Sequence, residues 1–240
     1  MNKQIYLSEY YSEIPSNCVF NKVATGCGGT TLEIENINRD SIITVPLEQM
    51  IENKTSQYPN ERTSQDFILF GVKAGVYKTD IIEYLDNNKH HKIITTYDSL
   101  YKVVEAISEW NKRKLKDYFL LIDEVHYILN NYLLRKNAIN RVLNVYKRFD
   151  RWCFMTATPN EPEFYLYELK DIPLVVAPLE MEEIKILNVK TIQVKATAKK
   201  LINDFIEYRL QNAHIFCNSL EIISSLIKEC ELNNENCRAV

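Results

Sequence analysis

The chain has 240 residues, of which 46% are hydrophobic and 25% are charged, and its formal net charge is -3 at pH 7. This composition is ordinary for a soluble globular protein, and the length allows one large α/β domain or one domain with part of another. A slightly acidic chain has no overall basic field for nucleic acid, so local clusters of Lys and Arg would have to supply one. No apolar stretch approaches the roughly 20 residues of a membrane span, so we expect no membrane partner.

The six cysteines are expected to be buried, reduced thiols. None forms a Cys-x-x-Cys pair, and several lie inside apolar runs, where free cysteine packs as a small hydrophobic residue. Because the start of the chain leads into no apolar signal segment, we expect a reducing, cytoplasmic location. The residues are Cys18, Cys27, Cys153, Cys217, Cys230 and Cys237.

Short apolar runs of strand length alternate with stretches of helical periodicity along the chain. This order predicts an α/β fold with a mostly parallel sheet and helices on both faces, in which ligands gather at the carboxyl ends of the strands. Strands are expected at 18–23, 41–45, 66–70, 92–95, 118–122, 151–155, 185–194 and 213–217. Helices are expected at 46–53, 77–87, 97–112, 138–147 and 198–211.

The pattern changes near residue 172. Pro173, Pro178 and the acidic residues between 180 and 183 indicate a linker or a domain-crossing segment. Residues 1–180 are therefore expected to form one domain, and residues 181–240 to form the linker and the beginning of a second α/β domain.

The first predicted strand runs into a Gly-rich turn that opens a helix. Three of the five glycines fall within 26–29, where glycine lets backbone N–H groups wrap a phosphate. Thr30 would place a hydroxyl where it could touch Mg²⁺. The standard phosphate loop has a lysine immediately before this hydroxyl, whereas this chain has Gly29. A Gly-rich turn without a ligand is therefore the alternative interpretation.

The apolar strand expected at 118–122 delivers Asp123 and Glu124 to its carboxyl end. Asp123 could hold Mg²⁺ through its water shell, since Mg²⁺ prefers oxygen ligands and keeps several waters. Glu124 is expected to point the other way and to orient or deprotonate an attacking water. A strand that ends in a solvated acidic turn is the alternative.

Another predicted strand ends in Thr156-Ala157-Thr158, a Thr-rich turn before Pro that is weak evidence by itself. Basic residues cluster at 112–116 and 135–151, either as a surface that tracks phosphates or as solvated helix faces. The solvated interpretation is favoured for 135–148. His90 and His91 are expected at the surface.

Taken in chain order, these motifs resemble those of superfamily 2 helicases and translocases of the DExH type, which are P-loop NTPases. The resemblance covers roughly residues 15–220. It implies two RecA-like lobes that clamp ATP and a nucleic acid strand, with ATP and Mg²⁺ as cofactors and DNA, more than RNA, as partner. It also implies that the remainder of the second lobe, with the family's arginine finger, lies beyond Val240.

The resemblance implies a role for each matching residue. Asp123, Glu124 and His126 would be catalytic, with Thr30 and Asp123 on the metal and His126 linking the site to the Thr156-Ala157-Thr158 motif by hydrogen bonding. Coupling of hydrolysis to strand movement would involve Thr156, Ala157 and Thr158. Nucleotide would be bound by Thr25, Gly26, Cys27, Gly28, Gly29, Thr30 and Thr31.

Nucleic acid would be contacted, by the same resemblance, at the ends of other strands. Packing in the protein core is an alternative role for the tyrosine among these residues. They are Pro46, Gln49, Thr95, Thr96, Tyr97 and Ser219.

Two functions remain open at this point. One is an ATP-dependent helicase or translocase core, and the other is a degenerate helicase-like module that binds nucleotide or nucleic acid without efficient hydrolysis. The second is motivated by Gly29, because the family's lysine there contacts the β- and γ-phosphates. Lys22 lies upstream on the strand and is an alternative that could reach in, but its offset matches no variant loop. Both functions require the turn at 26–30 and Asp123-Glu124 to meet at adjacent strand tips.

Overall fold

A computed structural model describes residues 5–58, 67–159, 166–179, 194–207 and 219–233. The chain divides into two compact units, Met1–Glu182 and Glu183–Val240. Each unit is described by itself.

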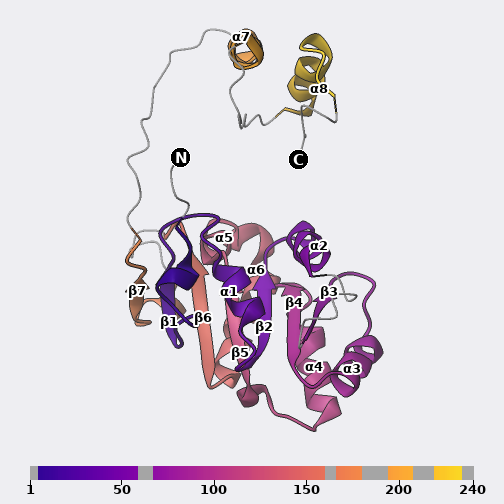
Figure 1. The fold of residues 1–240 in the computed structure, drawn as a ribbon. Helices are drawn as coiled ribbons and strands as arrows, with labels where there is room; N and C mark the ends of the chain where they lie inside the picture. Colours follow the sequence, from indigo (N-terminus) through magenta and orange to yellow (C-terminus); the bar gives the residue numbers. More distant parts are fainter. Residues whose placement is uncertain (1–4, 59–66, 160–165, 180–193, 208–218, 234–240) are drawn as a thin grey trace. The chain divides into compact units, whose positions relative to one another are not determined.

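The first unit is built on a seven-stranded sheet in the order β3-β4-β2-β5-β6-β1-β7, and all its strand pairs are parallel (Figure 1). The central strands β2, β4 and β5 are buried along their whole length, as expected for a parallel sheet covered on both faces. The strands are β1 Cys18–Asn21, β2 Asp40–Val45, β3 Ile68–Val72, β4 His91–Thr96, β5 Tyr118–Asp123, β6 Arg151–Thr156 and β7 Leu174–Val176.

Helices follow almost every strand of this unit (Figure 1). They are α1 Gly29–Glu35, α2 Glu48–Gln57, α3 Lys78–Asn87, α4 Leu100–Trp110, α5 Val125–Asn130 and α6 Tyr132–Val145. Short 3-10 turns add η1 Leu7–Glu9, η2 Leu115–Asp117, η3 Tyr146–Arg148 and η5 Tyr167–Leu169.

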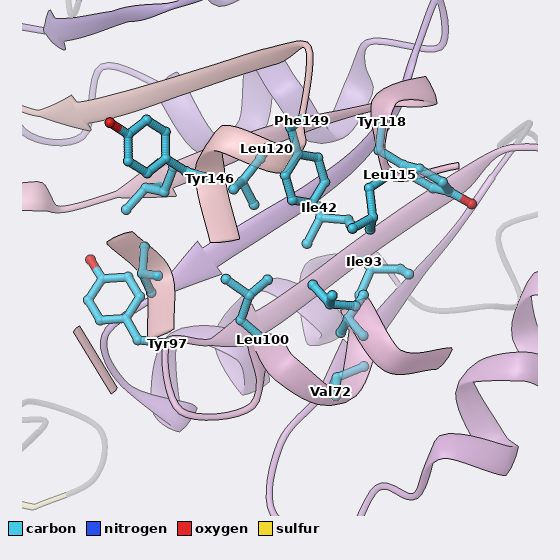
Figure 2. Packing of buried hydrophobic residues seen from close by; sticks show 14 of the residues in the cluster. Ile42, Val72, Ile93, Tyr97, Leu100, Leu115, Tyr118, Leu120, Tyr146 and Phe149 are labelled. Atoms are coloured by element: carbon cyan, nitrogen blue, oxygen red, sulfur yellow. The ribbon is translucent and has the colours of Figure 1, made fainter. Parts of the chain in front are cut away.

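Two hydrophobic cores lie on opposite faces of the sheet, because successive side chains of a strand point to opposite faces. Leu120 and Ile122 of β5 belong to the core that α3, α4, α5 and α6 cover. Figure 2 shows Leu120 in this core, close to Ile42, Ile93 and Leu100. Phe119 and Leu121 belong to the other core, which includes residues of η1, α1 and α2. The predicted α/β fold with helices on both faces is confirmed.

The structure also corrects several predicted elements. Residues 174–176, assigned to the linker from the prolines around them, form the edge strand β7. The short helix α5, which directly follows β5, was not predicted. Helix α6 begins six residues before the expected start at 138. His91 is buried at the start of β4 with 1% of its surface exposed, so its expected surface position is wrong.

The second unit contains α7 Val194–Glu207 and α8 Leu220–Glu229 among its described residues. Ile202, Leu226 and Cys230 form its small hydrophobic cluster, and Lys195 and Lys199 pair with Glu229. The strand expected at 213–217 lies outside the described residues. The strand expected at 185–194 also does so except for Val194, which begins α7 instead.

The described cysteines agree with the prediction of buried thiols. Cys18, Cys27, Cys153 and Cys230 are free and buried, and Cys217 and Cys237 lie outside the described residues. Within the described ranges, no helix has the length and apolar character needed to cross a membrane.

Candidate functional site

The predicted motifs gather at one edge of the sheet, where the parallel strands β1, β5 and β6 end. The strand order corrects one detail of the prediction, because β6 lies between β1 and β5. The ends of β1 and β5 are therefore separated by one strand, β6. Their side chains still meet, since the turn after β1 carries residues toward β5.

The Gly-rich turn uses backbone conformations that favour glycine. Gly26 and Gly28 have φ angles of 71° and 83°, in the left-handed region where a Cβ atom is unfavourable. The N-terminal segment supports the turn, because Leu7 N–H donates to the Cys27 carbonyl at 2.8 Å. Helix α1 begins at Gly29, so Thr30 lies in its first turn.

Thr30 joins the Gly-rich turn to the end of β5. Its hydroxyl donates to Asp123 Oδ2 at 2.6 Å, across 93 residues of sequence. Asp123 is buried, with 1% of its surface exposed. The structure thus brings together the two residues predicted to share a metal.

Lys22, which follows β1 directly, bridges the two acidic residues. Its Nζ lies 3.2 Å from Asp123 Oδ1 and 3.0 Å from Glu124 Oε1. Burial alone would lower the pKa of Lys22, but the two carboxylates outweigh it, so the pKa lies above its ordinary value. The side chain therefore stays charged at neutral pH.

Glu124 does not continue the alternation of β5. Its φ and ψ angles are 58° and 50°, a left-handed conformation that is uncommon for a residue other than glycine and that clusters at functional sites. Because of this turn, Glu124 faces the same ammonium group as Asp123. The expectation that it points the other way is wrong.

His126 connects the acidic motif, Asp123-Glu124, to the Thr-rich strand end, Thr156-Ala157-Thr158. Its Nδ1 lies 3.0 Å from Thr156 Oγ1 and 3.2 Å from Glu124 Oε2. Thr156 Oγ1 also accepts from Thr158 N–H at 3.1 Å. The hydrogen bond expected between His126 and this strand end is present, and a chain of short contacts runs from Glu124 to Thr158.

The remaining residues of the Gly-rich turn differ in what they can do. Thr25 is exposed, and Cys27 is buried with 2% of its surface exposed. Thr31 accepts a hydrogen bond from Lys54 Nζ of α2 at 3.0 Å. Lys54 thereby reaches the turn from a helix that the sequence linked to nucleic acid alone.

A groove of about 560 Å³ lies at the ends of β2 and β4, where nucleic acid contact was expected. Pro46 and Thr96 line it, in agreement with that expectation. Arg135 and Arg141 of α6 also line it, although both were expected on a solvated helix face. Arg135 is held in place by a 2.9 Å hydrogen bond to the Pro46 carbonyl and by an ion pair with Asp98.

Two other residues expected to touch nucleic acid are buried. Thr95 is 0% exposed and donates to the Val72 carbonyl, and Tyr97 is 1% exposed and donates to the Asp123 carbonyl. Neither side chain is exposed at the surface, and Tyr97 instead supports the backbone of Asp123. The packing alternative holds for Tyr97.

The other two expected contacts lie elsewhere. Gln49 is exposed on α2, close to Asn53. Ser219 belongs to the second unit, where its Oγ accepts from Ile222 N–H and caps α8.

The oxygen ligands at the site suit Mg²⁺ but do not complete its shell. Thr30 and Asp123 offer a hydroxyl and a carboxylate, the donor types that Mg²⁺ prefers. Throughout the described part of the chain, no group of three or more His, Cys, Asp and Glu residues is placed to hold a metal ion. A metal here would thus need ligands such as water and phosphate, as Mg²⁺ commonly has.

Comparisons with known structures agree with this architecture. The helicase MrfA superposes with a TM-score of 0.60 at 15% identity, covering 90% of this chain and 36% of MrfA. The Mycobacterium smegmatis helicase Lhr gives a TM-score of 0.56 at 16% identity, covering 93% of this chain and 32% of Lhr. The chain thus spans about a third of the length of each. No curated protein matches the sequence.

The family comparison covers the part of the chain that carries the site. The family model described as type III restriction enzyme, res subunit, matches residues 17–161. This range contains the Gly-rich turn, the acidic motif and the Thr-rich strand end, and it is more than half of the chain. The fold is the RecA-like fold of the helicase structures MrfA and Lhr. The chain belongs to the family of the type III restriction enzyme res subunit.

Proposed function

We propose that this chain is the ATP-dependent core of a nucleic acid helicase or translocase. The observation that carries the proposal is the 2.6 Å contact between Thr30 Oγ1 and Asp123 Oδ2. It joins a turn suited to phosphate with a carboxylate suited to Mg²⁺, so that one metal-bound triphosphate could touch both.

Each residue of the site would have a defined task. The turn at 25–31 would hold the phosphates, and Thr30 and Asp123 would hold the metal. Bound Mg²⁺ supplies positive charge that offsets the charge developing on the transferred phosphoryl group.

Glu124 is the candidate general base. A carboxylate oxygen of Glu124 would accept a proton from the attacking water, which makes that water a stronger nucleophile. About one fifth of the Glu124 side chain is exposed, at 21%, so water can reach it. Lys22 and His126 both contact this carboxylate and would hold its orientation.

The chain of contacts from Glu124 through His126 to Thr156 would couple the site to movement. A change at Glu124 alters the position of His126, and His126 is bonded to the strand end that carries Thr156, Ala157 and Thr158. The groove at Pro46 and Thr96 would hold the nucleic acid, with Arg135 and Arg141 near its phosphates. DNA is the partner to test first, because Lhr, a helicase similar in fold, was solved with single-stranded DNA and AMP-PNP.

The substitution Glu124→Gln tests the proposed hydrolysis. It keeps the size of the side chain and removes the base, so phosphate release by the full chain, with single-stranded DNA present, should fall by about 10²- to 10⁴-fold. Glu109→Gln is the matched control, because Glu109 lies on α4 with 55% of its side chain exposed and pairs with Lys78. Equal turnover in wild type and Glu124→Gln would contradict the mechanism.

A nucleotide-holding module without turnover is the second candidate, and Gly29 in place of lysine favours it. Two measurements on the wild-type chain distinguish the two candidate functions. Binding of ATP by calorimetry without DNA-dependent phosphate release supports the module, whereas sustained DNA-dependent release excludes it.

A further inference from the structure

At the position where the family's phosphate lysine is expected, a side chain would have to displace its neighbours. A Cβ atom added at Gly29 would lie 2.8 Å from Met155 Sδ and 3.0 Å from Met155 Cε. It would also lie 3.3 Å from Leu7 Cδ1. A Cβ atom does not approach that closely without a shift of the neighbour, so the buried Met155 side chain would have to move to admit a larger residue at 29.

A different lysine already lies at the site. Lys22 Nζ bonds to Asp123 Oδ1 and Glu124 Oε1, and Asp123 Oδ2 accepts from the Thr30 hydroxyl. The ammonium group and the Thr30 hydroxyl thus bind opposite oxygens of one carboxylate. The charge sits beside the turn that would hold the phosphates.

The backbone around Lys22 is fixed on both sides. Lys22 N–H donates to the Thr156 carbonyl at 2.8 Å, and the Lys22 carbonyl accepts from Ala24 N–H at 2.7 Å. Val23 has a φ of 64°, which is a true outlier for a β-branched residue and requires support from its surroundings. The Asn21 side chain gives that support by accepting from Val23 N–H at 2.8 Å. The backbone therefore fixes the point from which the Lys22 side chain reaches the site.

We propose that Lys22 is the phosphate-binding lysine of this chain and replaces the one that Gly29 cannot provide. This inference rests on the proposed function, since it assigns a ligand contact at the same nucleotide site. The Lys22 ammonium would contact the β- and γ-phosphate oxygens of a bound nucleoside triphosphate.

Lys22 and Mg²⁺ would also compete for the same ligand. Both are cations, and both would bind the Asp123 carboxylate. When the metal takes Asp123, Lys22 loses one of its two acceptors and the phosphates offer others. Two effects of removing its charge follow: weaker binding of triphosphate, and tighter binding of a divalent metal without nucleotide.

Lys54 is the other lysine that could bind the phosphates. Its Nζ lies 3.0 Å from Thr31 Oγ1 and 3.2 Å from Gln57 Oε1, so it too reaches the turn. Lys54 makes no hydrogen bond or ion pair with Asp123 or Glu124 and acts on Asp123 only through its charge at longer range, so its removal would not free a metal ligand. The two lysines are thus separable by the metal readout.

The test compares Lys22→Met with Lys54→Met in the full chain. Binding of AMP-PNP and of AMP with Mg²⁺ is measured by calorimetry, and binding of Mn²⁺ alone by electron paramagnetic resonance. Lys22→Met should bind AMP-PNP about 10- to 100-fold more weakly, the value of one charged hydrogen bond, and AMP with little change. It should also bind Mn²⁺ more tightly than wild type. Lys54→Met should show neither the loss nor the gain.

Other outcomes overturn the inference in distinct ways. Equal AMP-PNP affinity in wild type and Lys22→Met, or a loss confined to Lys54→Met, removes the role of Lys22 and leaves the proposed function intact. A wild-type chain that binds no AMP-PNP removes the proposed function and the role together. Should Lys22→Met fail to fold, Lys22→Gln and the charge-preserving Lys22→Arg replace it, and Lys22→Arg should bind AMP-PNP more tightly than Lys22→Gln.

Discussion

Two buried clusters of charged residues in the first unit contain a lysine bonded near a carboxylate, yet they differ in charge balance. The motif cluster consists of Lys22, Thr30, Asp123, Glu124 and His126. The inner cluster consists of Glu33, Arg39, Ser41 and Lys92, next to α1 and inside the sheet. The motif cluster has two carboxylates for one lysine, whereas the inner cluster has one buried carboxylate for two cations, and the exposed Glu13 lies 3.4 Å from Arg39 at its edge.

The pKa values of the two lysines move in opposite directions for this reason. Burial, with a smaller contribution from the nearby Arg39, lowers the pKa of Lys92 to about 8, while Glu33 opposes the change. The pKa of Lys22 is raised, because two carboxylates outweigh its burial. An excess of carboxylate can accept a further cation, and an excess of buried cation cannot.

Access to solvent separates the clusters as well. The side chains of Glu33 and Lys92 are 0% exposed and that of Arg39 is 2% exposed, whereas Glu124 is 21% exposed. The inner cluster is sealed and has a structural role. Burial and ion pairing alone therefore do not identify a site. The motif cluster is identified as a site because it has more carboxylates than lysines, is reached by water and lies beside a Gly-rich turn.

The largest effect should come from removing Glu33, the buried carboxylate of the inner cluster. Glu33→Leu leaves Arg39 and Lys92 as buried cations, so the free energy of unfolding in urea should fall by about 3–5 kcal/mol. Glu35→Leu is the matched control on the same helix, since Glu35 is exposed and accepts one hydrogen bond from Tyr58. It should cost about 1 kcal/mol. Similar losses for both variants would show that the inner cluster does not stabilise the fold.

A smaller effect should appear in the dependence of stability on pH. A lysine whose pKa is lowered on folding binds more protons when unfolded, so it opposes folding below the folded value of about 8, and this penalty is relieved as the pH rises toward 10.5. Relative to Lys92→Met, wild type should gain about 1–3 kcal/mol between pH 7 and pH 10.

Lys22→Met provides the contrast for that titration. The pKa of Lys22 is raised, so its stabilising charge persists below 10.5 and is lost above it. The difference in stability between wild type and Lys22→Met should therefore stay constant from pH 7 to pH 10. A constant difference for Lys92→Met as well would contradict the charge balance assigned to the inner cluster.

Strand positions could be predicted because the central strands of a parallel sheet covered on both faces contain apolar runs in the sequence, as in Tyr118–Asp123. β7 was missed since it is a three-residue edge strand between prolines, and its pairing with β1 depends on contacts across the fold. His91 reads as surface from its polar neighbours, but Tyr118 supplies a hydrogen bond at 2.7 Å that satisfies it when buried.

The site was predictable to the extent that each motif follows its own strand. Lys22 and Asp123 are 101 positions apart in the sequence, so no local sequence pattern predicts that they pair. The left-handed conformation of Glu124 likewise breaks the alternation from which its direction was inferred. Arg135 and Arg141 read as a solvated face because their partners, the Pro46 carbonyl and the Tyr101 ring, lie on other elements.

The central claim is that the Gly-rich turn and the acidic strand end hold one nucleotide together. A double-mutant cycle with Thr30→Val and Asp123→Asn tests it most directly, with calorimetric binding of Mg²⁺ and AMP-PNP to the wild-type, single-variant and double-variant chains. If both residues act through one metal-bound triphosphate, each single variant should bind more weakly, and the double variant should lose less than the sum, with a coupling of about 1 kcal/mol or more. Losses that simply add, or a variant pair that binds as wild type does, would contradict a shared site.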